Sequence, residues 1–212
     1  SKNELVINLR KIFCISNLTS IPDLTICGAF RTAATSSINI YVMYAWLKLC
    51  EYETKSEVCE NGLDKEKLRR RLPEILSLTT ADAPKMQERL TEIFHDCGIV
   101  FRIVKNFRGA PVHGYIKQTY DKTILCMTIR NKYADIFWFT LIHEIAHILN
   151  DDFKTELIDF DFRKTDMEMK ADKFAAEQLI ASNLYEEFVQ KGIFSRESVL
   201  RFSSEISRHP GI

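Results

Sequence analysis

The chain has no excess of charge of either sign. Of its 212 residues, 29 are Lys or Arg and 29 are Asp or Glu, so the formal net charge is zero. A chain without net charge produces no long-range basic field for nucleic acid and no acidic field for a basic partner. We therefore expect these 212 residues by themselves to bind no nucleic acid directly.

Long apolar runs are also missing. No run approaches the roughly 20 apolar residues that a membrane-spanning helix needs. The richest stretch, INIYVMYAWLKLC at residues 38–50, is shorter and is typical of a buried helix. The first residues also lack the basic and then apolar layout of a signal peptide. The sequence therefore predicts no membrane contact.

The cysteines lack any C-x-x-C pair. All six are scattered along the chain, and most of them lie among apolar residues. In such surroundings a free cysteine behaves as a small hydrophobic residue. The pattern indicates six free thiols, which are stable in a reducing compartment, and we expect a cytoplasmic protein.

The sequence does contain an ordered series of helical and strand patterns. Helical spacing of apolar residues predicts helices at both ends, and short β-branched segments predict strands between them. This order is typical of an α+β fold, here with a small three-stranded antiparallel sheet. The expected strands are 99–104, 112–117 and 123–129, and the helices that follow them are 135–150, 166–181, 184–191 and 195–207.

The stretch FWFTLIHEIAHILN contains two histidines four residues apart, with a glutamate directly after the first. On a helix, His143 and His147 are about 40° apart and project from one face, one turn from each other. This spacing lets both imidazoles reach a single Zn²⁺. Glu144 lies about 100° from His143, which is too far round for a ligand but close enough for a general base toward a water at the metal.

A third ligand distinguishes a metal site from a chance occurrence of the motif, in which backbone or water would satisfy both histidines. Glu168 follows His147 by twenty-one residues on the next predicted helix, and Asp172 shares its face one turn later. We expect Glu168 to complete the His-His-Glu set of catalytic zinc sites and Asp172 to orient a ligand histidine. The alternative for Glu168 is a solvated charge, because other charged residues surround it.

The chain contains three longer motifs, namely an APV-x-G strand, the run R-x-K-Y-x-D-x-FWFTL-x-HE-x-x-H, and an E-x-x-AD-x-FA helix. With these motifs it resembles the ImmA/IrrE family of metallo-endopeptidases. The resemblance spans roughly residues 80–212. It implies a zincin-like metallopeptidase domain at 79–212, cut short at its C-terminus, behind a helical connector at 1–78.

The resemblance also implies a set of roles and a function. His143, His147 and Glu168 become the ligands of one zinc ion per chain, and Glu144 becomes the base. The implied partner is a protein substrate, namely a transcriptional repressor that is cleaved or inactivated in a mobile element or a stress response. We also expect a helix-turn-helix DNA-binding unit upstream of residue 1 and a homodimer of the longer protein.

A second hypothesis comes from a different class of protein. The chain could be a zinc-binding sensor or regulatory domain of a helix-turn-helix regulator or antitoxin, with little or no proteolysis. The connector-like N-terminal helices favour this regulatory hypothesis. The intact Glu144 favours the enzyme, because a structural zinc site has no use for a base.

The donor that would stabilise a developing oxyanion is not singled out by the sequence. The candidates are His113, Tyr115 and Tyr133, and each also suits a packing or surface role. His113 and Tyr115 fall on one face of the expected strand 112–117. That strand could also pair with an extended substrate.

Overall fold

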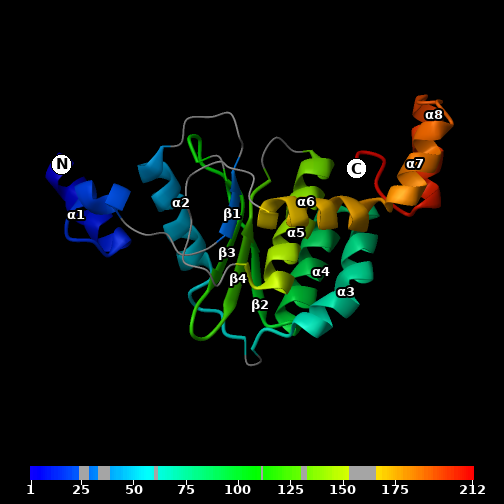
Figure 1. Ribbon diagram of the computed structural model, residues 1–212. Coiled ribbons are helices and arrows are strands. Elements are labelled where there is room, and N and C mark those ends of the chain that lie inside the picture. The colour runs from blue at the N-terminus through cyan, green and yellow to red at the C-terminus, as the bar shows by residue number, and fades with distance from the viewer. Residues whose placement is uncertain (24–28, 33–38, 60–61, 111, 130–132, 153–165) are drawn as a thin grey trace.

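The computed structural model describes residues 1–23, 29–32, 39–59, 62–110, 112–129, 133–152 and 166–212. These residues form an α+β fold, as the sequence predicts, with a sheet between two helical layers (Figure 1). Helix α2 covers one face, and α3, α4 and α5 cover the other. The elements are α1 (Lys2–Phe13), η1 (Leu18–Asp23), β1 (Ala29–Thr32), α2 (Ile40–Glu53), α3 (Lys65–Ser77), η2 (Leu78–Thr80), α4 (Ala83–Asp96), β2 (Ile99–Ile103), β3 (Val112–Gln118), β4 (Thr123–Met127), α5 (Ala134–Asn150), α6 (Asp166–Leu179), α7 (Ser182–Gln190) and α8 (Arg196–Glu205).

The prediction of a three-stranded antiparallel sheet is wrong in two respects. The described sheet has four strands in the order β1-β3-β4-β2, and β2 is parallel to β4. Strands β3 and β4 are antiparallel because a tight turn joins them, closed by a 2.9 Å hydrogen bond from Thr119 N–H to the Lys122 carbonyl. The longer connection from β2 to β3 instead carries the chain past β4, so β2 pairs with β4 and not with its neighbour in sequence.

The position of β3 also overturns the hypothesis that residues 112–117 pair with an extended substrate. Strand β3 lies inside the sheet, with β1 hydrogen-bonded along one side and β4 along the other. Its backbone donors and acceptors are therefore used within the protein. Among the described strands, the edges are β1 and β2.

The two faces of the sheet belong to two hydrophobic clusters, as the alternation of side chains along a strand requires. Ile116, Leu125 and Met127 pack with α3, α4 and α5, whereas Tyr115, Ile124 and Cys126 pack with α2. Strand β1 and helices α2 and α3 precede residue 79 and belong to the sheet or its clusters. The expected boundary between 1–78 and 79–212 thus falls inside this arrangement.

Helix α5 is the most enclosed of the described helices. Twelve of its seventeen residues are buried, which is why its sequence has almost no polar face. The helix ends where Asp151 takes a left-handed conformation, with φ of 63°. The Asp151 carboxylate also forms an ion pair with Lys65 at the start of α3. The C-terminal end of the stretch that carries the histidines is therefore fixed relative to α3.

Two further expectations concern the chain as a whole. None of the described helices has the length and apolar character required to cross a bilayer. The cysteines in the described part of the chain are free thiols, namely Cys14, Cys50, Cys59, Cys97 and Cys126. Cys27 lies outside the described residues.

Candidate metal centre

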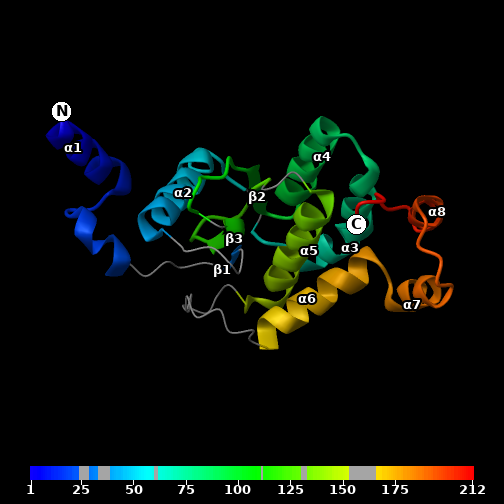
Figure 2. The same cartoon turned by 90° about the horizontal axis from the view of Figure 1, so that it is seen from above.

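The site forms where α6 packs along α5 (Figure 2). Helix α6 approaches closely because two fully buried alanines, Ala171 and Ala175, occupy its contact face. Glu168 and Asp172 lie at the same spacing beside these alanines, one turn apart. The pattern of small and acidic residues on α6 therefore carries two carboxylates to the histidines of α5.

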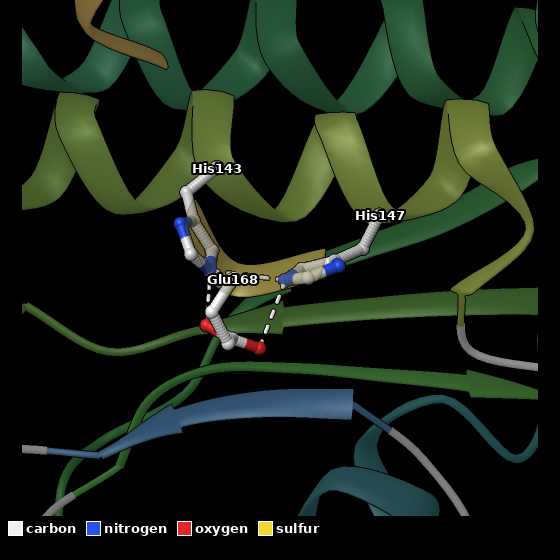
Figure 3. A group of neighbouring side chains, drawn as sticks. All are labelled: His143, His147 and Glu168. Carbon is white, nitrogen blue, oxygen red and sulfur yellow. Dashed lines mark hydrogen bonds and ion pairs between the residues drawn. The ribbon is translucent and has the colours of Figure 1, made fainter. Parts of the chain in front are cut away.

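The side chains of His143, His147 and Glu168 converge on one point (Figure 3). His143 Nε2 lies 3.1 Å from Glu168 Oε2, and His147 Nε2 lies 3.3 Å from Glu168 Oε1. The two Nε2 atoms are 3.0 Å apart. Both histidines are almost completely buried, whereas the Glu168 side chain is 42% exposed. The site therefore opens to solvent on the side of Glu168.

A carboxylate holds each imidazole from behind. His143 Nδ1 lies 2.9 Å from Asp172 Oδ1, as the sequence predicts for a residue that orients a ligand histidine. His147 Nδ1 lies 3.0 Å from Asp152 Oδ2. When Nδ1–H donates to the carboxylate, a neutral imidazole presents only a lone pair at Nε2. Both lone pairs then point into the space shared with Glu168.

This donor set fits a metal ion. Ligand atoms at 2.0–2.1 Å around a tetrahedral ion are roughly 3.3 Å from one another. The separations among the three groups here are 3.0, 3.1 and 3.3 Å, the last two to different oxygens of Glu168. Two nitrogen lone pairs and a carboxylate at such distances repel one another unless a cation or a proton lies among them. His143, His147 and Glu168 could therefore hold a metal ion.

The pKa values of His147 and Glu168 in the metal-free site also indicate that a positive charge belongs among these groups. Burial by itself lowers the pKa of His147, but the hydrogen bond to Glu168 and the charge of Glu144 outweigh it and raise this pKa to about 9. Burial acts in the opposite sense on Glu168, yet the hydrogen bonds to the two histidines hold its pKa well below the usual range. Without a metal the cluster thus holds a proton at neutral pH.

Glu144 is completely buried and lies on α5 directly after His143. It is not one of the three groups whose ligand atoms converge, as its position on the helix predicts. Its side chain instead packs against strand β3 at Gly114. The acid that the sequence assigns as a base is therefore next to the ligand set and separate from it.

The three candidates for the oxyanion donor differ in their position relative to the site. The prediction of Tyr115 is wrong, because its ring packs against Trp46 on the face of the sheet opposite α5, with ring centroids 6.1 Å apart. Tyr133 is also wrong, because it is exposed at the start of α5, ten residues or about 15 Å of helix before His143. His113 is buried on β3 next to Gly114, where a register shift against β1 interrupts the alternation of side chains between the two faces, so His113 stays a candidate.

Asp152 is a site residue that sequence reasoning missed. It comes after the end of α5, where helical periodicity no longer indicates which way a side chain points. The left-handed conformation of Asp151 turns the chain back, so Asp152 reaches the imidazole of His147, five residues earlier. The available signal was an acidic pair directly after a histidine-bearing helix.

Comparison with protein-family models, with curated proteins and with solved structures finds no match for this chain. The resemblance seen in the sequence motifs thus has no independent support from relatives. What the site can do must be inferred from its own geometry.

We expect the protein to bind about one zinc ion per chain and the His143→Ala/His147→Ala variant to bind none, because that variant keeps a single ligand of the three. Elemental analysis after gel filtration of the zinc-loaded proteins measures the ratio. His95→Ala, which removes an exposed histidine on α4, is the matched control. An unchanged ratio in the double variant would remove the site from these residues.

Zinc binding is expected to release a proton near neutral pH. Because the pKa of His147 is raised to about 9 in the metal-free protein, from 6.5, this side chain is protonated below that pH and must lose its proton to bind a metal. Affinity for zinc should therefore rise with pH until about 9. In the metal-free protein the sign is opposite: stability from charged His147 is complete below 6.5 and is lost as the pH rises through about 9.

Isothermal titration at about pH 7 in buffers of different ionisation enthalpy measures the number of protons released. The observed enthalpy should vary with the ionisation enthalpy of the buffer. An enthalpy independent of the buffer would show that the histidines are neutral before the metal arrives.

Replacing Asp152 with Asn should weaken zinc binding by about 10- to 100-fold, because the neutral amide no longer stabilises the Nδ1–H of His147. Competition with a chromogenic chelator measures the dissociation constant. Asp135→Asn is the control, since Asp135 is an exposed acid on the first turn of the same helix. Equal affinities in the two variants would mean that Asp152 does not act on the metal site.

Proposed function

We propose that this chain is a zinc-dependent endopeptidase whose substrate is a transcriptional repressor. The observation that supports it most directly is the pairing of two features in one place. Three ligand groups from α5 and α6 converge. A completely buried acid that is not one of these groups, Glu144, lies beside them on α5. A structural metal site needs only the first of these features.

The chain's own residues account for most of the proposed chemistry. A zinc ion held by His143, His147 and Glu168 would supply Lewis acidity, which would polarise a scissile carbonyl and lower the pKa of water toward ~7. Glu144 then accepts the proton of the attacking water and delivers it to the leaving amine nitrogen. Asp172 and Asp152 keep the two imidazoles in the orientation that ligation needs.

An extended peptide could bind near this site at an edge of the described sheet. Strand β1 forms an edge of the described sheet and contacts α5. A substrate strand that adds to this edge would form backbone hydrogen bonds and pass close to the metal ligands. The repressor as substrate rests on the resemblance of the sequence motifs, because the geometry supports only peptide hydrolysis in general.

A regulatory domain without proteolysis is the second candidate, and helix α1 favours it. This helix lies at the outer end of the fold in both views (Figures 1 and 2) and contacts α2 through the rings of Phe13 and Tyr44. Several of its apolar side chains are exposed, namely Leu5, Val6, Ile7 and Ile12. An exposed apolar helix is typical of a segment that contacts another unit. In this candidate the metal would stabilise the fold, and Glu144 would take no part in chemistry.

The Glu144→Gln variant separates the two candidates. We expect it to bind zinc as the unaltered chain does and to lose cleavage by about 10²- to 10⁴-fold, because the amide cannot accept the proton of water. The assay incubates each zinc-loaded protein with the repressor encoded beside its gene and identifies products by mass spectrometry. Glu88→Gln, an exposed glutamate on α4, is the control.

Two outcomes would contradict the proposal. Equal cleavage by the Glu144→Gln variant would remove the base. Absence of cleavage by the unaltered zinc-loaded chain, with the repressor released from DNA nonetheless, would favour the regulatory domain.

A further inference from the structure

A glycine stands in the sheet where the side chain of Glu144 packs. Gly114 pairs with Met127 across β3 and β4 and shares its face, the one covered by α5. The neighbouring positions of this face hold large side chains that are completely buried, including Ile116 and Leu125. At Gly114 the space between strand and helix is filled by Glu144 of α5 instead.

Backbone conformation does not explain this glycine. The described glycines with positive φ are Gly98, Gly109 and Gly192, so Gly114 has a backbone that other residues also adopt. A glycine inside a strand weakens the strand, and it often marks a close approach of another group. The absence of a side chain must therefore be what position 114 requires.

The approach is too close for even one added carbon. A Cβ at position 114 would lie 2.7 Å from Cγ and 2.8 Å from Cδ of Glu144, and it would also collide with Oε1. Carbon atoms in van der Waals contact are about 3.5–4.0 Å apart. An alanine at 114 must therefore displace the side chain of Glu144, because the three nearest heavy atoms all belong to it.

The displaced carboxylate would have little room. Glu144 is completely buried, and its neighbours on α5, His143 and Ile145, are buried too. Moving a carboxylate into the apolar cluster costs more than moving it toward the histidines. Its position relative to the metal ligands thus depends on the bare backbone below it.

We propose that Gly114 is the positioning residue of Glu144: it leaves a strand position without a side chain, on which the carboxylate lies beside the metal ligands and apart from them. The effect on catalysis rests on the proposed function, whereas the packing of Glu144 on Gly114 does not. The two parts are measured separately, so that failure of one is distinguishable from failure of the other.

The packing is tested by a double-mutant cycle of thermal stability on the zinc-loaded chain. Gly114→Ala should lower the midpoint of unfolding by an amount on the order of 5 °C, because overpacking a buried site strains it. In the Glu144→Ala background the same change should have almost no effect, because the colliding atoms are gone. Gly62→Ala is the control, since no atom lies within 4 Å of a Cβ built at that exposed position.

The positioning is tested by kinetics on the repressor, per zinc-loaded chain. Gly114→Ala should lower kcat by about 10²-fold, the usual effect of misplacing a catalytic group by about 1 Å. KM and the dissociation constant for zinc should stay close to those of the unaltered chain, because His143, His147 and Glu168 are not displaced. A role in stability alone would leave kcat per folded chain unchanged.

Several results would overturn the inference. One is an equal loss of stability from Gly114→Ala in both backgrounds, which would locate the strain in the strand. Another is a normal kcat in the Gly114→Ala variant of an active protein. If the Gly114→Ala variant does not fold, the Gly114→Ala/Glu144→Ala double variant should fold, because the colliding side chain is gone. A double variant that also fails to fold would refute the packing of Glu144 on Gly114. If the unaltered chain cleaves no repressor, the double-mutant cycle of thermal stability still decides whether the side chain of Glu144 packs on Gly114.

Discussion

Repulsion between like groups is the constraint around which this structure is arranged. Helices α5 and α6 bring two imidazole nitrogens and a carboxylate within about 3 Å of one another. Asp172 and Asp152 lie within hydrogen-bonding distance of the two imidazoles, and Glu144 follows His143 on α5. In the metal-free site a proton on His147 offsets part of this repulsion, and a divalent cation would take its place. The zero net charge of the chain therefore conceals a local concentration of acidic side chains. The four acids are Glu144, Asp152, Glu168 and Asp172.

The features that the sequence predicts correctly depend on local periodicity. Helical spacing identifies α5 and α6, and it places His143, His147, Glu168 and Asp172 on the right faces. The identity and approximate limits of β2, β3 and β4 follow from their β-branched composition. In each case the information lies within a few residues of the group concerned, because the geometry of one helix or strand fixes it.

The features that it does not predict depend on contacts between distant segments. Which strands pair is decided by the connection between β2 and β3, and nothing within β2 shows that it runs parallel to β4. Strand β1 is four residues long and becomes a strand only by pairing with β3. Tyr115 satisfies the chemistry of an oxyanion donor but faces α2, and Gly114 has a role only because α5 crosses above it.

Helix α6 begins only two residues before Glu168, so the third ligand belongs to the first turn of that helix. The first N–H groups of a helix have no acceptors inside the helix, and this turn opens at the least cost in free energy. An ion held by Glu168 would tie this opening turn to the interior of α5. Its binding free energy therefore includes closing the turn, and chelation should loosen the start of α6 before it affects the core. The exchange of amide hydrogens in that turn would then report on occupancy of the site while the rest of the fold stays intact.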